Sequence, residues 1–384
     1  MKTFNVYNIF DIEIQKAKGS YVWDTKGTKY LDLYGGHAVI SVGHSHPEYI
    51  EAITNQLNEI GFYSNSVKIG LQDQLAEKLG ELSGYSDYQL FLCNSGAEAN
   101  ENALKLASFQ NGKKKIIAFK GSFHGRTSLA VSATDNPSII APINENEHII
   151  FLDLNDCEQF EKAMDSSICA VIIEGIQGVG GINIPDAGFL SFIQQKCEEF
   201  GVILILDEVQ SGYGRSGKFF AHQYSGIEPD LITIAKGMGN GFPVGGVLVS
   251  PKIRAIKEML GTTFGGNYLA CAAAISVLEI IEKEKLIENS CEIGEYLIER
   301  LRSMRFVKEV RGCGLMIGIE LFEPCADVRK ELLFEHQIFT GASSNKNTIR
   351  ILPSLAIGKQ EIDIFLEAFS TVMAEKVPSL ANES

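Results

Sequence analysis

From about residue 48 to about residue 265, short apolar runs alternate with longer segments whose apolar residues recur at helical spacing, such as 189–200. Seven of the runs have the length and branched composition of buried strands. They lie at 89–93, 116–119, 148–152, 169–173, 202–206, 231–235 and 246–249. This alternation predicts an α/β fold with a mostly parallel, doubly wound sheet of about seven strands.

The pattern is different at the two ends of the chain. Residues 19–36 resemble a hairpin around a turn at 24–27. From about residue 266 an Ala-rich helix (269–282) leads to an amphipathic helix (286–304), and strands are expected near 307–311, 315–320 and 348–352. We therefore expect a large domain over 45–275 and a smaller α+β domain made of 1–44 and 276–384, with the last residues, 378–384, frayed.

Composition narrows the class of protein. A chain of 384 residues can bury a large core, and its formal net charge of −14 argues against nonspecific binding to nucleic acid. It has no apolar stretch of the roughly 20 residues that span a bilayer, and its N-terminus lacks the apolar core of a signal peptide. The eight cysteines form no CxxC pair and read as reduced core thiols. We expect a cytoplasmic protein without a metal site.

Two of the predicted strands end in groups that carry chemistry. The run 202–206 is followed by Asp207 and Glu208, and the run 231–235 is followed by Lys236. The carboxyl ends of parallel strands form the ligand crevice of such sheets, so an acid and a lysine should share one pocket. A lysine placed there can form an imine with a carbonyl, and the acid can hold the pyridinium nitrogen of pyridoxal phosphate.

The segment after the first strand offers a phosphate site. Ser95, Gly96 and Ala97 follow a strand and open a helix, where backbone N–H groups and the helix dipole favour an anion. A plain helix N-cap by Asn94 or Ser95 explains the same residues. The presence of Lys236 in the same predicted crevice favours the phosphate interpretation.

Three further side chains are candidates with an equally good structural explanation. Phe123 could stack on a flat cofactor, and Arg126 could bind a carboxylate in bidentate fashion. The alternative is a surface loop with one core aromatic residue. Glu174, at the end of another strand, could support the site as a neighbouring acid or could be a solvated strand end.

Two motifs point elsewhere and are set aside. Residues 212–217 fit G-x-G-x-x-G, but no long helix is expected after them, so a dinucleotide site and a dehydrogenase are the weaker interpretation. His44-Ser45-His46 has metal-like spacing without an acid or cysteine at ligand distance in sequence, so a structural turn before Pro47 is preferred.

Taken together, these residues resemble the class III aminotransferases of fold type I, which use pyridoxal 5'-phosphate. The similarity extends over nearly the whole chain. The motifs that carry it are LDLYGGHAVISVGHSHP (31–47), CNSGAEANENALKLA (93–107), GSFHGRTSLAVSAT (121–134), LDEVQSGYGRSGKFFAHQ (206–223), AKGMGNGFPVGG (235–246), TTFGGNYLACAAA (262–274) and TIRILPSL (348–355).

The resemblance implies how the cofactor would be held. Lys236 would bond covalently to the cofactor and later move the proton, and Asp207 would pair with the ring nitrogen. Val209 and Phe123 would lie on opposite faces of the ring, and Gln210 would contact its hydroxyl group.

The resemblance also assigns the phosphate and the substrate. Gly96 and Ala97 would hold the phosphate, together with Thr263 from a partner subunit, which implies a homodimer. Arg350 would bind the α-carboxylate of glutamate or 2-oxoglutarate. Arg126 would bind the distal carboxylate, and also the carboxylate of an N-acylornithine.

The expected reaction is transfer of the amino group of N-acetylornithine or N-succinylornithine to 2-oxoglutarate, in arginine synthesis. One position departs from the pattern. Family members of the ornithine and GABA type commonly carry Glu five residues after the Glu174 position, where it neutralises the arginine that matches Arg350, and here that residue is Val179. The alternatives are another ω-amine donor, an α-amino acid donor, a protein that binds the cofactor without turnover, or a dehydrogenase.

Overall fold

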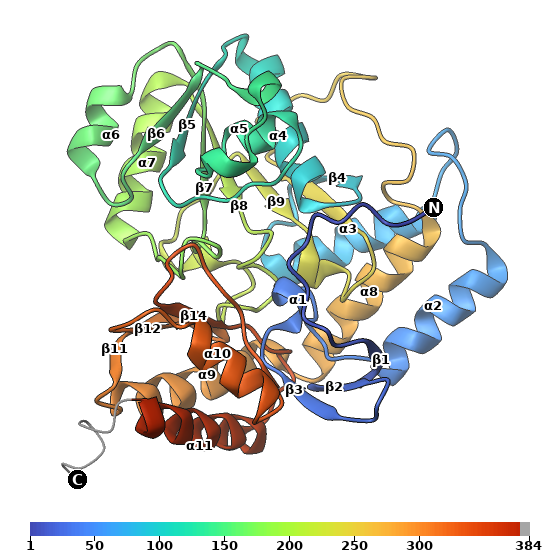
Figure 1. Ribbon diagram of the computed structural model, residues 1–384. Helices are drawn as coiled ribbons and strands as arrows, with labels where there is room; N and C mark the ends of the chain where they lie inside the picture. The colour runs from blue at the N-terminus through green and yellow to red at the C-terminus, as the bar shows by residue number, and fades with distance from the viewer. Residues whose placement is uncertain (377–384) are drawn as a thin grey trace.

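The computed structural model describes residues 1–376 and is built around one seven-stranded sheet (Figure 1). Its strand order is β4 (Gln89–Cys93), β10 (Gly245–Val249), β9 (Leu231–Ile234), β8 (Ile203–Asp207), β7 (Ile168–Glu174), β5 (Lys115–Phe119) and β6 (Ile149–Leu152). Every pairing from β9 to β6 is parallel, and β10 is antiparallel to both of its neighbours. The predicted mostly parallel sheet of seven strands is confirmed.

Helices cover both faces of this sheet because successive side chains of its strands point to opposite sides. On one face, Ala118 and Ile172 pack in a cluster with residues of α4 (Gly96–Asn111). On the other face, Ile117 and Val171 pack with residues of α7 (Ala187–Phe200). The short helix α5 (Ser128–Ser132) packs against α4, and α6 (Cys157–Ala163) packs against α7. Strands buried on both faces explain why these runs are apolar throughout.

A small sheet joins the two ends of the chain. It has the order β1 (Ile14–Lys18), β2 (Tyr21–Asp24), β3 (Lys29–Asp32) and β13 (Ile338–Phe339). The predicted turn at 24–27 joins β2 to β3, and the Asp24 carboxylate accepts hydrogen bonds from the backbone N–H groups of Lys26 and Thr28. Strand β1 was not predicted. The pairing of β3 with β13 is consistent with the predicted domain division, which stays a prediction.

A third sheet has the order β11 (Val307–Cys313), β12 (Met316–Leu321) and β14 (Thr348–Ile351). In Figure 1 this sheet lies with α9 (Leu286–Arg302), α10 (Ala326–Phe334) and α11 (Lys359–Lys376) at the end of the molecule opposite β5 and β6. The predicted helix at 269–282 is α8 (Tyr268–Lys283), which packs against α2 (Pro47–Glu59) and α3 (Gly70–Ser83).

The remaining elements are short. They are α1 (Gly35–Ala38) and four 3-10 turns, η1 (Pro137–Ile139), η2 (Pro142–Asn144), η3 (Ala221–Tyr224) and η4 (Lys236–Met238). Within residues 1–376, no helix is both long enough and apolar enough to span a membrane. All eight cysteines are free, and five of them are buried: Cys93, Cys169, Cys197, Cys271 and Cys325. Residues 378–384, which were predicted to be frayed, lie outside the described part of the chain.

Candidate active site

Three parallel strands bring the predicted chemistry to one edge of the large sheet. Glu174 at the end of β7 pairs in register with Asp207 at the end of β8, and Asp207 pairs with Thr233 of β9. Lys236 follows shortly after β9 ends. The two carboxylates and the amine line the same cavity, so the crevice expected at the carboxyl ends of the strands is present.

The Asp207 carboxylate is 4% exposed and is held by three donors. Its Oδ2 accepts hydrogen bonds from Asn100 Nδ2 at 2.7 Å and from His124 Nδ1 at 2.8 Å, and its Oδ1 accepts one from the Val209 N–H at 3.0 Å. Within residues 1–376, His124 Nε2 is buried without a hydrogen-bond partner. Asn100 and His124 were not predicted as site residues. These contacts fix the Asp207 side chain where its charge can face a ligand in the cavity.

Glu174 is buried and accepts two backbone hydrogen bonds, from Phe123 N–H and from Gly178 N–H, each at 3.0 Å. Burial raises its pKa to about 7, although His124 opposes the shift. Asp207 adds to it, because a second negative charge nearby disfavours ionisation. Glu174 therefore keeps a proton more readily than an ordinary carboxyl group does.

Lys236 combines backbone strain with a shifted pKa. Its φ is +46°, a backbone conformation that residues other than Gly, Asn and Asp adopt rarely. Burial lowers the pKa of its amine to about 8, although the Asp207 and Glu174 carboxylates act in the opposite direction. Strained residues with perturbed pKa values cluster at functional sites, which supports the prediction for this lysine.

The N-terminus of α4 forms one wall of the cavity. Ser95 is the N-cap of this helix, and its hydroxyl accepts a hydrogen bond from Glu98 N–H at 3.2 Å. Gly96 lies so close to Val209 that an added Cβ would be 2.5 Å from Val209 Cγ1. A backbone of small residues at a helix N-terminus is the arrangement expected for an anion. The N-cap interpretation of Ser95 and a phosphate site at Gly96 and Ala97 are thus compatible.

The cavity measures about 400 Å³, a size suited to a small cofactor and substrate. Ten of the twelve predicted site residues line it: Ser95, Gly96, Ala97, Phe123, Arg126, Glu174, Asp207, Val209, Gln210 and Lys236. A helix N-terminus for a phosphate, a fixed carboxylate for a ring nitrogen and an amine of lowered pKa are the groups that pyridoxal phosphate requires. The residues present therefore fit this cofactor.

The two arginines predicted to bind substrate carboxylates differ in burial. Arg126 is exposed and lines the cavity. Arg350 is 3% exposed, and its guanidinium donates from Nε to the Ala342 carbonyl at 2.5 Å and from Nη1 to Gln210 Oε1 at 3.3 Å. Gln210, predicted to face the cofactor ring, is therefore also a neighbour of Arg350.

Two positions outside the cavity bear on the predictions. Thr263 is exposed and does not line the cavity of its own chain. Val179 leaves no acid at its position, and among residues 1–376 Arg350 forms no ion pair with a carboxylate. Burial lowers the pKa of Arg350, and the nearby Glu174 and Tyr34 partly oppose that shift.

The motifs that were set aside have structural roles. Residues 208–220 form a series of turns, and no long helix begins after the glycines at 212–217, so the basis for a dinucleotide site is lost. His44 and His46 bind different carboxylates, those of Asp32 and Glu284, at 2.8 and 2.9 Å.

Comparison with known proteins identifies the family to which this chain is similar. The family described as "Aminotransferase class-III" matches residues 3–373. Acetylornithine aminotransferase of Bacillus subtilis is 43% identical over 369 residues, covering 94% of each chain. The protein of the same name from Archaeoglobus fulgidus is 40% identical, covering 93% of this chain and 94% of its own.

Solved structures agree with this result. The ornithine aminotransferase of Toxoplasma gondii superimposes with a TM-score of 0.89 at 27% identity, covering 97% of this chain and 93% of its own. An amine transaminase from an uncultivated Pseudomonas species, solved in its PLP-bound form, gives a TM-score of 0.89 at 25% identity and covers 98% and 99% of the two chains.

Proposed function

This chain belongs to the class III aminotransferases, and from that premise we propose that it transfers the amino group of N-acetylornithine or N-succinylornithine to 2-oxoglutarate. The products are the N-acyl glutamate semialdehyde and glutamate, and the step belongs to arginine biosynthesis. The names of curated relatives at 43% and 40% identity over nearly the whole chain support this substrate. The observation that carries the chemistry is the register that pairs Glu174 with Asp207 at the strand ends, with Lys236 following β9 into the same cavity.

The cofactor is pyridoxal 5'-phosphate, which supplies an aldehyde that binds amines and a ring that accepts electrons. Gly96 and Ala97 at the start of α4 would hold its phosphate. Asp207, fixed by Asn100 and His124, would hold the protonated ring nitrogen.

Lys236 performs the proton transfer in this proposal. With its pKa lowered to about 8, a useful fraction of the amine is neutral near neutral pH, as a general base requires. The neutral amine takes the proton from the reacting carbon of the amino donor. The resulting ammonium group would then give that proton to the cofactor and not back to the donor carbon, which leaves the Lys236 amine neutral again.

The arginines would select substrates by their carboxylates. Arg350, which forms no ion pair among residues 1–376, would bind the α-carboxylate of glutamate and 2-oxoglutarate. Arg126 at the rim would bind the distal carboxylate and the carboxylate of the N-acylornithine. Bidentate recognition of a planar carboxylate is the task for which a guanidinium is suited.

The proposal includes a cytoplasmic homodimer. Thr263 would reach the phosphate of the partner's site, since it is exposed and does not line the cavity of its own chain. Beside it, the exposed rings of Phe62 and Phe264 are in contact, with centroids 5.4 Å apart. An exposed aromatic pair of this kind suits a surface that a second subunit covers.

A panel of half-reactions tests the proposed function. The purified protein should be yellow, lose that colour when N-acetylornithine or N-succinylornithine is added, and regain it with 2-oxoglutarate. Ornithine, GABA and α-amino acids serve as comparison donors. A protein that keeps its colour with every donor, or that responds only to a nicotinamide cofactor, would contradict the assignment.

The lack of an acid at position 179 favours one second candidate, an α-amino acid donor. Such a donor carries a carboxylate at the reacting carbon and would neutralise Arg350 in both half-reactions. The same panel separates the two candidates.

A further inference from the structure

The loop that follows β7, residues 175–181, has few side chains with which to hold itself in place. Four of its seven residues are glycine. Gln177 ties the middle of the loop to Asn183 by a backbone bridge, and the residues on either side of Gly180 are held from the sheet of β11, β12 and β14 and its neighbouring turn. The Val179 carbonyl accepts a hydrogen bond from Ser344 N–H at 2.9 Å, and the Gly181 carbonyl accepts two from the Arg311 side chain, at 3.1 and 3.4 Å.

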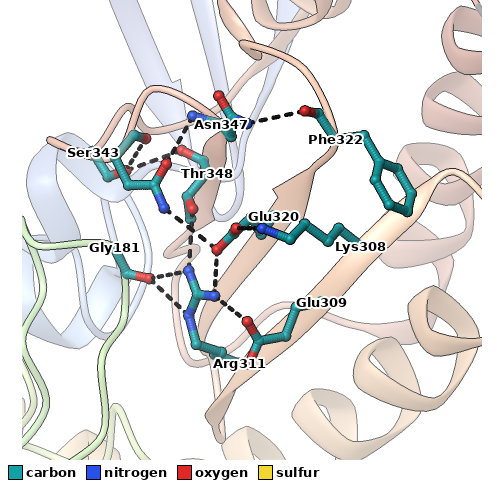
Figure 2. Close-up of polar contacts among 10 residues, drawn as sticks. Gly181, Lys308, Glu309, Arg311, Glu320, Phe322, Ser343, Asn347 and Thr348 are labelled. Atoms are coloured by element: carbon teal, nitrogen blue, oxygen red, sulfur yellow. Dashed lines mark hydrogen bonds and ion pairs between the residues drawn. The ribbon is translucent and has the colours of Figure 1, made fainter.

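Arg311 is fixed from the opposite side by two acids and a hydroxyl (Figure 2). Its Nη1 donates to Glu320 and to Glu309, each at 2.5 Å, and its Nη2 donates to Thr348 Oγ1 at 3.1 Å. Glu320 is 8% exposed and also binds Lys308 at 2.6 Å. The planar fork of an arginine can serve all these acceptors at once, whereas a lysine ammonium cannot reproduce the geometry.

The register of the sheet places Arg311 and Arg350 in one row. Gly318 of β12 pairs with Arg311 of β11 on one side and with Arg350 of β14 on the other. The loop crosses this row at Gly318, where an added Cβ would lie 3.0 Å from the Gly181 carbonyl oxygen. The missing side chain therefore lets the loop approach the strand between the two arginines.

A short series of contacts joins the held end of the loop to the active site. Gly181 N–H donates to the Gly178 carbonyl at 3.3 Å, and Gly178 N–H donates to the buried Glu174 carboxylate. Gly178 also lies against Gln210, since an added Cβ would be 1.7 Å from Gln210 Oε1. That same oxygen accepts the hydrogen bond from Arg350.

We propose that Arg311 is a positioning residue for the substrate. By holding the Gly181 carbonyl, Arg311 keeps residues 175–181 packed against Gly318 of β12. The loop in turn fixes the positions of Gln210 and Glu174 beside Arg350. The proposal rests on the proposed function, in which Arg350 binds the α-carboxylate of 2-oxoglutarate. The cofactor contacts of α4 and Asp207 lie elsewhere and do not depend on Arg311.

The test compares four variants of the cofactor-loaded enzyme. Arg311→Met removes the grip on Gly181, Arg311→Lys keeps the charge, and Gly318→Ala pushes the loop away without changing any charge. The matched control is Lys308→Met, which removes an ion pair of Glu320 and leaves every Arg311 contact in place. Hydrogen exchange of peptides covering residues 175–183 is measured together with KM and kcat for 2-oxoglutarate.

We expect Arg311→Met to speed exchange in these peptides by about tenfold, since their protection reports local opening. KM for 2-oxoglutarate should rise by about tenfold while kcat stays within about twofold, because uniform binding is lost. Gly318→Ala should behave like Arg311→Met, Arg311→Lys should fall between it and the wild type, and Lys308→Met should match the wild type. The amount of cofactor bound per subunit should be the same in all five proteins, because Asp207 and the start of α4 are unchanged.

Two results would overturn the proposal. One is exchange over 175–183 that is the same in Arg311→Met, Gly318→Ala and the wild type. The other is faster exchange with an unchanged KM, which would make Arg311 structural only. A wild-type enzyme that does not use 2-oxoglutarate at all would instead overturn the proposed function, and the exchange data would still show whether Arg311 holds the loop.

Discussion

At Lys236, desolvation acts on the one amine that the proposed chemistry needs in its neutral form. Because burial lowers its pKa from 10.5 to about 8, the neutral amine is half populated near pH 8. Covalent capture of pyridoxal phosphate by the cofactor-free protein should therefore accelerate as pH rises through about 8 and then level off. Absorbance-monitored mixing at pH 6 to 10 measures this, with Lys236→Ala as the background. A midpoint above pH 10 would contradict the lowered pKa.

Removal of the same amine should abolish turnover. Lys236→Ala leaves no other amine in the cavity, so the absorption band of the covalently bound cofactor should disappear as well. Lys120→Ala is a suitable control, because that lysine follows β5 of the same sheet and pairs with Asp153 instead. Multiple turnovers at a rate near wild type in Lys236→Ala would disprove the assignment.

Asp207→Asn should keep the fold and lose most of the activity. The amide cannot neutralise a protonated ring, and losing a hydrogen bond to a charged group removes about 1.5–3 kcal/mol in the ground state. A loss of that size weakens cofactor binding by about ten- to a hundredfold, and kcat falls because a larger loss is expected in the transition state. Steady-state kcat measures the effect. A small change in kcat would mean that Asp207 is not the ring partner.

The sequence was sufficient to place Asp207 and Lys236 in one pocket because strand ends of a parallel sheet meet at one edge. It was not sufficient for Asn100 and His124, whose roles depend on how α4 and the loop after β5 pack against β8. One signal was available for Asn100. It is a polar residue on the helix face that also carries the buried Ala99 and Ala103, where an unpaired amide would be costly.

Among the elements, strand β14 carries Arg350, which in our proposal acts in only one of the two half-reactions. Arg350→Ala should impair the half-reaction with 2-oxoglutarate and spare the one with N-acylornithine, because an acylated ornithine reacts at its δ-amine and presents no carboxylate there. Single-turnover rates of each half-reaction measure this. Equal damage to both halves would point to an α-amino acid donor.

Val179→Glu should act in the opposite direction. A carboxylate there would pair with Arg350, favour the ω-amine half and weaken 2-oxoglutarate binding by competing for the guanidinium. Val179→Gln, a neutral side chain of the same length, is the matched control. If Glu and Gln variants behave alike in both half-reactions, charge at this position does not govern the choice of substrate.

Element boundaries show where pattern analysis is strong and where it is not. The seven core strands were found because each is a short, mostly apolar run that packs side chains against both faces of the sheet. Strand β1 was missed because its residues are mostly exposed, with no apolar pattern to mark them. Strand β13 has only two residues, which is too short for any periodicity.

For the whole molecule, the proposed shared site makes cofactor binding depend on protein concentration. Thr263→Ala should weaken affinity for the cofactor, and dilution of the wild type into monomers should release it, since a ligand held by two subunits favours the dimer. Sedimentation combined with cofactor absorbance measures both quantities. A monomer that keeps full cofactor occupancy at nanomolar concentration would contradict a shared site, and Thr262→Ala serves as the neighbouring control.

The position of β10 in the large sheet has a consequence for how the chain is made. Strand β4 lies at the sheet edge and pairs with β10, so Cys93 leaves the ribosome long before its partner Gly245 exists. At translation rates of about 5–20 residues per second, that interval lasts roughly eight to thirty seconds. Throughout this interval, the backbone N–H and C=O groups of β4 that later bind β10 are unpaired, and they can pair with strands of other chains. Force-sensing arrest peptides should register the closing of this sheet only once β10 has emerged, and nascent chains that end earlier should need a chaperone to stay unaggregated.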